Sequence, residues 1–428
     1  MKEHPALTEA NPVADAVVTR IYSNFIMRIL SLAVLGMYLS ILSAFSQGNT
    51  DSSKYQNKKL QFEEVDFVAS YYRQDGNNSA VTGGTGTEKL TDFTNTIELK
   101  MIKYDNKERK NQFKIEFGID HYTSASSDKI DPSTISSASF DDTRLYPSLS
   151  WNRENEKRGT NVGITASYSR EADYKSYGTG VNFRKTSADK NRELDISLQA
   201  FFDKWKVIFP VELRPPNYGT GAKNDNLRVD HTPRNSYTAS LSYSMVVNKK
   251  LQVLLLTDPT YQRGLLATKF HRVYFTDGSA RPENLPNKKM KLPVGIRANY
   301  FSGDYVVLRS LYRFYIDDWG MKAHTIEMET AVKFSNFISL SPFYRFHTQN
   351  AIDYFAEFSK NKLNRTYFMS DYDLSTLESH FFGMGIRITP PKGITGSGKL
   401  NMLELRYGHY TRSTALQSDI ISLHVKFK

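Results

Sequence analysis

Apolar and polar residues alternate with a period of two along most of the chain from about residue 61 onward. One stretch shows the pattern clearly, with charged or small residues between four apolar ones, Phe113, Ile115, Phe117 and Ile119. Side chains along a strand point to opposite faces in turn, so the pattern predicts strands with one apolar and one polar face. The sixteen segments that show it are 61–73, 92–104, 112–123, 142–152, 160–170, 174–185, 192–203, 236–247, 250–258, 292–302, 305–317, 322–334, 337–349, 377–389, 400–411 and 418–428.

The connections between these segments alternate between short polar turns and long loops. Short links follow the second, fourth, sixth, eighth, tenth and twelfth segments, and 105–111 and 153–159 are examples. Long links follow the first, third, seventh, ninth and thirteenth segments, over 74–91, 124–141, 204–235, 259–291 and 350–376. Short turns at one rim and long loops at the other are typical of an outer-membrane barrel. Both chain ends then lie on the short-turn, periplasmic side.

A soluble β-sandwich would also alternate, so the two fold classes have to be separated. Strands of roughly ten to thirteen residues match a tilted span of a bilayer, whereas soluble strands usually have about five or six. Many polar positions carry charge, and a soluble core does not accept buried charges in such number. Aromatic residues gather at strand ends, as in Tyr71-Tyr72 and Phe381-Phe382, which suits interfacial girdles. We therefore predict an all-β protein, an antiparallel up-and-down transmembrane β-barrel of about 16 strands over residues 61–428.

An apolar stretch near the N-terminus predicts a targeting segment. Met27-Arg28 precedes a largely apolar run over 29–42, and small residues follow in Ser43-Ala44-Phe45-Ser46. This is the anatomy of a secretory signal peptide, although a membrane anchor is the alternative. We expect residues 1–46 to be an N-terminal extension and signal peptide, and 47–60 to be a periplasmic N-terminal segment. Either the first methionine or Met27 is the true start.

The composition narrows the function classes. Lys plus Arg is 56 and Asp plus Glu is 45, which gives a formal net charge of +11. The absence of cysteine excludes disulfides and cysteine-based metal or redox sites. An excess of basic residues could indicate binding of nucleic acid. Lys and Arg in turns and rims near anionic headgroups explain the excess better. We expect outer-membrane lipid and the barrel-assembly machinery as partners, and no nucleic acid.

The alternation also assigns faces on three consecutive strands between residues 305 and 349. If Val306 and Leu308 face lipid, the residues between them face the interior. The candidate lumen-lining residues are Arg309, Arg313, Glu327, Glu329, Arg345 and His347. We expect the two arginines of the first strand to lie near the two glutamates of the next. Two interpretations stay open: a lumen held together by ion pairs, or a polar passage for a solute.

Several other groups of polar residues suggest chemistry less strongly. Asp353 and Asp371-Tyr372-Asp373 could bind a divalent cation, or could form a solvated acidic loop. Asp75-Gly76-Asn77-Asn78 could bind calcium but also reads as an ordinary turn. His347 and His380 could ligate a metal across neighbouring strands, but no third ligand is in view. Whether any metal binds stays unknown.

Two further motifs argue against catalysis. Gly83-Gly84-Thr85-Gly86 is rich in glycine but lacks the residue order of a phosphate-binding loop. Ser310 and His324 could be imagined as a lipase-like dyad, but nothing in their spacing supports it. We therefore expect no enzyme and no cofactor.

Several stretches, spread over nearly the whole mature chain, resemble an uncharacterised family of outer-membrane β-barrel proteins from Gram-negative bacteria, a domain of unknown function. These stretches are Asp75-Gly76, residues 81–92, 122–128, 136–139, Phe202-Asp203-Lys204-Trp205, 312–320, Ala323-His324-Thr325, 342–349 and 370–374. The resemblance implies a barrel in the outer membrane with no established activity. Genes of such barrels often lie beside those for a small lipoprotein, a thioredoxin-like protein and a flavin transferase, which suggests by association an envelope redox module.

The sequence therefore predicts a channel or transport component of the cell outer membrane of a Gram-negative bacterium, for a small solute or an export substrate. The alternative is a non-conducting scaffold that docks a periplasmic or surface lipoprotein or a redox partner. Long loops rich in small and polar residues, on a rigid barrel, are suited to such recognition.

Overall fold

The computed structural model describes residues 59–123, 141–219, 229–396 and 398–428. All of them belong to one compact unit, Asn57–Lys428. The expected signal peptide and nearly all of the expected periplasmic segment lie outside the described residues, so both stay predictions. No helix in the described ranges is long and apolar enough to cross a bilayer.

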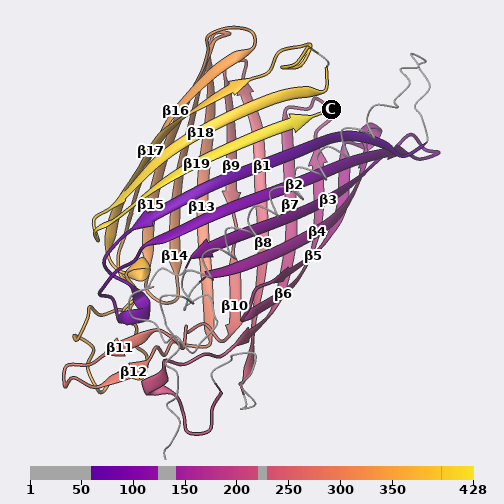
Figure 1. Cartoon of the computed structure of the whole chain (residues 1–428). Helices are drawn as coiled ribbons and strands as arrows, with labels where there is room; N and C mark the ends of the chain where they lie inside the picture. Colours follow the sequence, from indigo (N-terminus) through magenta and orange to yellow (C-terminus); the bar gives the residue numbers. More distant parts are fainter. Residues whose placement is uncertain (1–58, 124–140, 220–228, 397) are drawn as a thin grey trace, which may run out of the picture. The chain divides into compact units, whose positions relative to one another are not determined.

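The described chain forms one closed antiparallel sheet in which each strand pairs with its neighbours in sequence, and β1 pairs with β19 to complete the barrel (Figure 1). Its strands are β1 (Gln61–Asp75), β2 (Leu90–Tyr104), β3 (Lys110–Thr123), β4 (Asp141–Asn155), β5 (Thr160–Arg170), β6 (Tyr174–Thr186), β7 (Arg192–Lys206), β8 (His231–Asn248), β9 (Leu251–Thr257), β10 (Thr260–Gly264), β13 (Lys288–Ser302), β14 (Val306–Asp317), β15 (Lys322–Lys333), β16 (Ile338–Gln349), β17 (Leu377–Ile388), β18 (Leu400–Arg412) and β19 (Leu416–Phe427). The short strands β11 (Arg272–Tyr274) and β12 (Ala280–Pro282) form a separate hairpin.

Two of these elements share one position in the barrel. Both β9 and β10 lie between β8 and β13, with Asp258-Pro259 between them. Proline has no backbone N–H and cannot donate to a sheet, so the ladder is interrupted there. The described residues therefore form a barrel of sixteen strand positions, as the sequence predicted.

Each of the sixteen predicted segments is a strand, and the differences lie at the ends. The largest are at the position of β9 and β10, which continues to Gly264 rather than ending at 258, and at β8, which begins at His231 rather than at 236. β8 continues past the apolar alternation to pair with β7 as far as Lys206. The predicted arrangement of links is also confirmed. Turns of two to five residues join most strand pairs at one rim, such as 249–250 and 105–109, although 389–399 is longer.

The two rims of the barrel differ in what they carry. The long links 76–89, 207–230, 265–287 and 350–376 are all at one rim, together with the β11–β12 hairpin at the lower end in Figure 1. The first strand begins and the last strand ends at the opposite rim. The C-terminus is visible there, at the upper end of the view.

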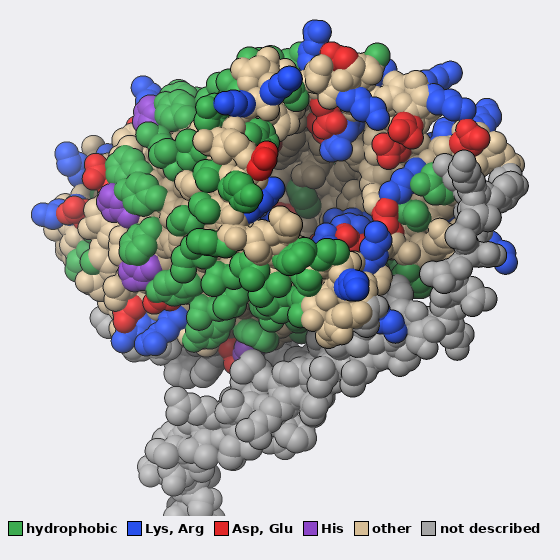
Figure 2. Space-filling model, turned by 90° about the horizontal axis from the view of Figure 1, so that it is seen from above, with side chains coloured by type: hydrophobic (Ala, Val, Ile, Leu, Met, Phe, Trp, Pro, Cys, Tyr) green, Lys and Arg blue, Asp and Glu red, His purple; other side chains and the backbone are tan. Residues whose placement is uncertain are grey.

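The outer face of the wall is apolar. Large hydrophobic side chains at alternate positions are about 40–50% exposed, including Phe117, Ile326 and Ile421 at 43%, 49% and 47%. Figure 2, seen from the rim that carries the C-terminus, shows hydrophobic side chains over much of the outer surface and charged side chains around a central hollow. This is the surface of a membrane-spanning barrel, with apolar residues outside and polar residues inside.

Several loops at the long-loop rim pack on one another, and we call this assembly the loop cap: residues 76–89, 207–219, 265–287, 318–321 and 350–376. One buried cluster consists of Ala267, Leu285, Trp319, Met321, Ile352 and Met369. A second consists of Val273, Phe275 and Phe368, the first two of which are completely buried. The loop cap also contains the one-turn helices η2 (Ala80–Thr82), η4 (Val211–Leu213) and η5 (Tyr372–Leu374), whereas η3 (Glu156–Arg158) is a turn at the other rim.

The glycine-rich motif serves close packing inside the loop cap. Gly83 and Gly84 have φ of +84° and +86°, a conformation that L side chains rarely adopt. A Cβ on Gly84 would lie 2.6 Å from the Ser370 carbonyl oxygen, and one on Gly83 would lie 2.6 Å from the Tyr274 ring. The two glycines therefore let the 76–89 loop approach the other two loops directly.

Candidate functional site

The inner wall of the barrel is polar, because the residues that alternate with the apolar outward-facing ones are mostly polar and face the interior. On β14, Tyr312 is outward and 41% exposed, so Arg309, Arg313 and Tyr315 are on the inner face. The register places Arg309 opposite Glu329 and Arg313 opposite Thr325. The inner wall is therefore the first place to look for a function.

A continuous series of ion pairs covers the inner face of β14 to β18. Glu329 contacts Arg309 at 2.5 Å and Arg406 at 2.7 Å. Arg406 also lies 3.2 Å from Glu404, which pairs with Arg387 at 2.7 Å. Each of these two glutamates is thus shared by two guanidinium groups, and we call the series the arginine network.

A second series lies on the inner face of β1, β2, β3 and β19. Lys100 contacts Glu64, Asp66 and Glu98 at 2.7, 3.0 and 3.1 Å. Lys426 pairs with Glu64 at 2.9 Å, and the His424 ring lies 2.8 Å from Asp66. Glu98 also pairs with Lys114. We call this series the lysine network, and the two together supply fixed charges of both signs.

The inner face of β4 to β8 is different, because it is formed mostly by uncharged hydroxyl groups. Its hydroxyl residues are Ser148, Ser150, Thr165, Ser167, Ser169, Ser176, Ser197, Ser236, Thr238, Ser240, Ser242 and Ser244. Several face one another across strands, as Ser148 does Ser167 and Ser197 does Ser240. The wall is thus asymmetric: ion-pair networks dominate one side, whereas on the other side, which we call the hydroxyl-lined arc, hydroxyl residues outnumber charged ones such as Arg184 and Asp195.

A pocket of about 400 Å³ opens in this hydroxyl-lined part of the wall. Arg144 lies over the Tyr146 ring at 5.3 Å and its Nε donates to Ser169 Oγ at 2.9 Å. Arg234 lies over the Trp205 ring at 4.5 Å, with its Nε 3.3 Å from Asp203. Two arginines held on aromatic rings beside serine hydroxyls form a binding surface suited to a polar solute.

The structure brings together some of the predicted lumen residues and separates others. Arg309 pairs with Glu329 as expected, but Glu327 pairs with Arg345, at 2.7 Å, rather than with Arg313. Arg313 is instead opposite Thr325, nearer the long-loop rim than Glu327 and Glu329. His347 contacts Thr325 Oγ1 at 2.9 Å and Gln349 Oε1 at 3.1 Å. Whether these six residues contact a solute stays a prediction.

The two histidines considered as metal ligands lie on opposite faces of the sheet. In the register of β16 and β17, Phe346 is opposite His380 and His347 is opposite Ser379. His380 points outward with Tyr344, whose hydroxyl lies 2.8 Å from its Nδ1, so the pair cannot bind one ion. The imagined dyad is not formed either, since His324 contacts the Tyr312 hydroxyl at 2.9 Å.

The acidic loop residues also have other contacts. Asp373 pairs with Arg412, and Asp371 accepts a hydrogen bond from the Asp373 N–H at 2.9 Å. Asn78, in the turn considered for calcium, donates to the Thr414 carbonyl oxygen at 2.6 Å. Neither stretch forms a group of carboxylates that converge on one point.

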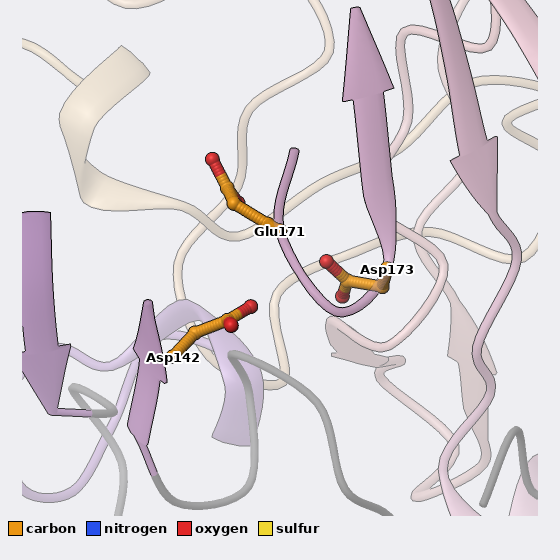
Figure 3. A group of neighbouring side chains, drawn as sticks. All are labelled: Asp142, Glu171 and Asp173. Atoms are coloured by element: carbon orange, nitrogen blue, oxygen red, sulfur yellow. The ribbon is translucent and has the colours of Figure 1, made fainter. Parts of the chain in front are cut away.

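Three other carboxylates, which no sequence motif groups together, do converge. Asp142, Glu171 and Asp173 offer oxygens within 4.8 Å of one another, at the long-loop rim between β4, β5 and β6 (Figure 3). The Tyr122 hydroxyl donates to Glu171 at 3.0 Å, and the Ala172 N–H donates to Asp142. Burial raises the pKa of Glu171, with the charges of Asp142 and Asp173 adding to it, against the opposing effects of Tyr122 and Arg144. The group has the donor chemistry of a divalent-cation site, or of carboxyls that share protons.

A cluster of titratable groups lies in the loop cap, and Glu283 is its buried member. His271 Nδ1 lies 3.2 Å from Glu283, with Asp371 and Asp373 nearby. Burial alone lowers the pKa of His271, but the hydrogen bond and charge of Glu283 outweigh it, so this pKa lies above its ordinary value. Burial, and then the charge of Asp373, raises the pKa of Asp371 to about 7. Protonation of both groups is thus favoured in the folded loop cap.

The loop cap should be more stable at mildly acidic pH than at alkaline pH. Both folded-state pKa values lie above the unfolded ones, so the stabilisation is present at low pH. It is lost as the pH rises toward about 7 for Asp371, and as the pH rises above the ordinary pKa for His271. We expect the opening equilibrium to rise by up to about tenfold per pH unit for one net proton. The measurement is limited proteolysis within 265–287 from pH 5.5 to 8.5, scaled at each pH to Asp371→Asn. Equal pH dependence in both proteins would contradict the assignment.

The chain matches one protein family and is similar to several solved structures. A profile of the family described as "Protein of unknown function (DUF3570)" matches residues 31–417. No curated protein matches the sequence. Among solved structures, the chain is similar to the siderophore receptor PirA from Acinetobacter baumannii, with 11% identity, a TM-score of 0.44, and coverage of 83% of this chain and 54% of the receptor. The chain thus spans about half the length of that receptor.

Two porin structures are also similar. OpdQ from Pseudomonas aeruginosa has 10% identity and a TM-score of 0.40, with coverage of 86% of this chain and 98% of OpdQ. A BenF-like porin from Pseudomonas fluorescens Pf-5 has 7% identity and a TM-score of 0.41, with coverage of 87% of this chain and 100% of the porin.

Proposed function

The chain belongs to the family described as protein of unknown function (DUF3570), and we propose that it is an outer-membrane channel for a small polar solute or an export substrate. The observation that carries the proposal is the inner wall, which combines the arginine network, the lysine network and a hydroxyl-lined arc. A barrel of sixteen strands has an interior wide enough for water. Fixed charges and hydroxyl groups along such an interior select solutes by charge and hydrogen bonding.

The direction of the barrel in the membrane follows from its two rims. Outer-membrane barrels have short turns on the periplasmic side and longer loops outside. The short-turn rim with both ends of the barrel then faces the periplasm, and the loop cap faces the exterior. A solute that enters from outside would meet the loop cap first, and then the pocket with Arg144 and Arg234.

The proposal is tested by recording ionic current through the purified full-length protein in planar bilayers. We expect discrete conductance steps, and larger steps for a variant in which residues 268–284 are replaced by a short Gly-Ser linker. Heat-modifiable gel migration of both proteins checks that the barrel is closed. If both closed barrels give flat traces, the channel proposal is wrong.

A non-conducting scaffold is the second candidate, and the loop cap favours it. Its loops contain their own buried cores, which is more structure than an open entrance needs. Such a folded surface could dock a surface lipoprotein, or a redox partner if the gene association reflects a shared module. Site-specific photo-crosslinking from Arg281, which is exposed on β12 of the β11–β12 hairpin, in intact cells would capture that partner.

A further inference from the structure

The outer wall of the barrel has an apolar hollow where β6, β7, β8, β10 and β13 meet. The hollow has a volume of about 450 Å³. Small side chains form its floor, since Ala200 and Ala239 lie beside Pro259 in two neighbouring cross-strand rows. Larger side chains form its edges, namely the exposed Val181, Leu198, Tyr237 and Met290 and the half-buried Tyr261. A wall whose only contact is with bulk lipid chains has no need of a hollow of this size.

An aromatic row lies next to the hollow on the side of the long-loop rim. Register places Tyr168 opposite Tyr177, and Tyr177 opposite Phe202, all on the outer face. The Tyr168 and Tyr177 rings are 5.2 Å apart, and the Phe202 and Tyr237 rings are 6.2 Å apart. Aromatic rows at this level mark the boundary between hydrocarbon and headgroups.

Five exposed cations lie at or just beyond the aromatic row. Arg170 is opposite Lys175, and Lys175 is opposite Lys204, on three adjacent strands. Arg263 is opposite Lys288 on β10 and β13. None of the five forms an ion pair within the described ranges of the chain, and like charges placed directly opposite are destabilising. The nearby carboxylates are engaged elsewhere: Glu171 and Asp203 with arginines, and Asp318 with the Met290 N–H.

Two separate groups of cations beside an apolar hollow are suited to a ligand that carries separated negative charges and acyl chains. We propose that this outer-wall site binds one molecule of a bisphosphorylated, acylated glycolipid of the lipid A type. The two cation groups are separated by β8, or about 10 Å from β7 to β10 at the usual strand spacing. A glycolipid with two phosphates on a disaccharide can reach both groups, whereas phosphatidylglycerol and phosphatidylethanolamine carry one phosphate each. One acyl chain occupies the hollow below the aromatic row.

The inference rests on the proposed placement in the outer membrane with the long-loop rim outward. It is otherwise separate from the channel proposal, because the site is on the lipid-facing wall and not on the inner wall. Binding in detergent micelles does not depend on orientation. The placement itself is checked on the cysteine-free chain by labelling Thr276→Cys and Asp304→Cys in intact cells with a bulky, impermeant maleimide. Only the first should be labelled.

The test is native mass spectrometry of the full-length protein in detergent, titrated with bisphosphorylated lipid A, monophosphorylated lipid A, phosphatidylglycerol or phosphatidylethanolamine. We expect a one-to-one adduct with bisphosphorylated lipid A that binds roughly tenfold more tightly than the other three probes. The double variant Lys175→Gln with Lys204→Gln should lose roughly tenfold in affinity. Ala239→Phe, which fills the hollow, should reduce binding of all acylated probes.

Matched controls lie on the same outer face at a distance from the site. Lys322→Gln removes an exposed lysine at the same rim on β15, and Ala298→Phe adds a ring on β13; neither should change binding. All variants should keep the wild-type conductance. Equal affinity for phosphatidylglycerol, or unchanged affinity in the lysine and alanine variants, would overturn the site. A flat conductance trace with intact lipid A binding would overturn only the channel proposal.

Discussion

Replacing Glu329 by glutamine is expected to lower the free energy of unfolding by about 2 kcal/mol and to make the lumen more anion-selective. Glu329 holds both Arg309 and Arg406, so the change leaves Arg309 without a carboxylate partner and leaves Arg406 with Glu404 alone. Removing one partner of a charged hydrogen-bonded pair costs more than the pair itself contributes. Exposure of both arginines to lumen water keeps the cost moderate. Heat-modifiable migration against temperature measures stability, and the reversal potential in a salt gradient measures selectivity.

Glu327→Gln is the matched control, because Glu327 pairs with one arginine, Arg345, and not with two. We expect about half the loss of stability and a smaller shift in reversal potential. Equal effects from the two variants would show that the sharing of Glu329 by two arginines adds nothing to stability or selectivity. An unchanged reversal potential in both would show that the arginine network does not face the conducting path.

Replacing Arg272 by alanine is expected to open the loop cap while leaving the barrel intact. The Arg272 side chain is 11% exposed and joins three loops. It contacts Glu212 at 2.5 and 3.2 Å and donates to the Val81 carbonyl oxygen at 3.1 Å. Charged hydrogen bonds of this kind contribute about 1.5–3 kcal/mol each, so proteolysis within 265–287 should accelerate by at least about tenfold.

Arg281→Ala is the control within the same hairpin. Arg281 is exposed and makes a cation–π contact 4.8 Å from the Phe275 ring centroid, which is worth about 0.5–1 kcal/mol at such a site. Its effect on proteolysis should be several-fold smaller. Comparable cleavage of the two variants, or loss of heat-modifiable migration in Arg272→Ala, would show that Arg272 does not act as a local link between loops.

The sequence was sufficient to predict the wall of the barrel because one simple rule governs it. Alternation with a period of two decides which residue faces lipid, and hydrocarbon tolerates few exceptions. The same rule placed Arg309 and Glu329 on the inner face. It could not fix which cross-strand partners meet, since that depends on the stagger between strands. Arg313 therefore lies opposite Thr325, and Glu327 pairs with Arg345.

Other parts of the site left a weaker signal or none. The hydroxyl-lined arc is visible in the sequence, because Ser240, Ser242 and Ser244 alternate with the apolar residues of β8. Serine residues alone did not suggest a binding site. Asp142 and Glu171 are far apart in sequence and meet because the start of β4 lies beside the turn between β5 and β6. The loop cap depends on contacts between loops, such as Arg272 with Glu212, for which periodicity gives no information.

Closure of the wall by its first and last strands has a consequence for how the protein is made. β1 and β19 share eleven residue pairs, from Val65 with Phe427 to Asp75 with Gln417. The seam can form only after the final dozen residues have left the ribosome and crossed the envelope. A chain that ends early, for example at Thr414, would therefore keep two unpaired strand edges and should aggregate or be degraded rather than persist as a smaller pore.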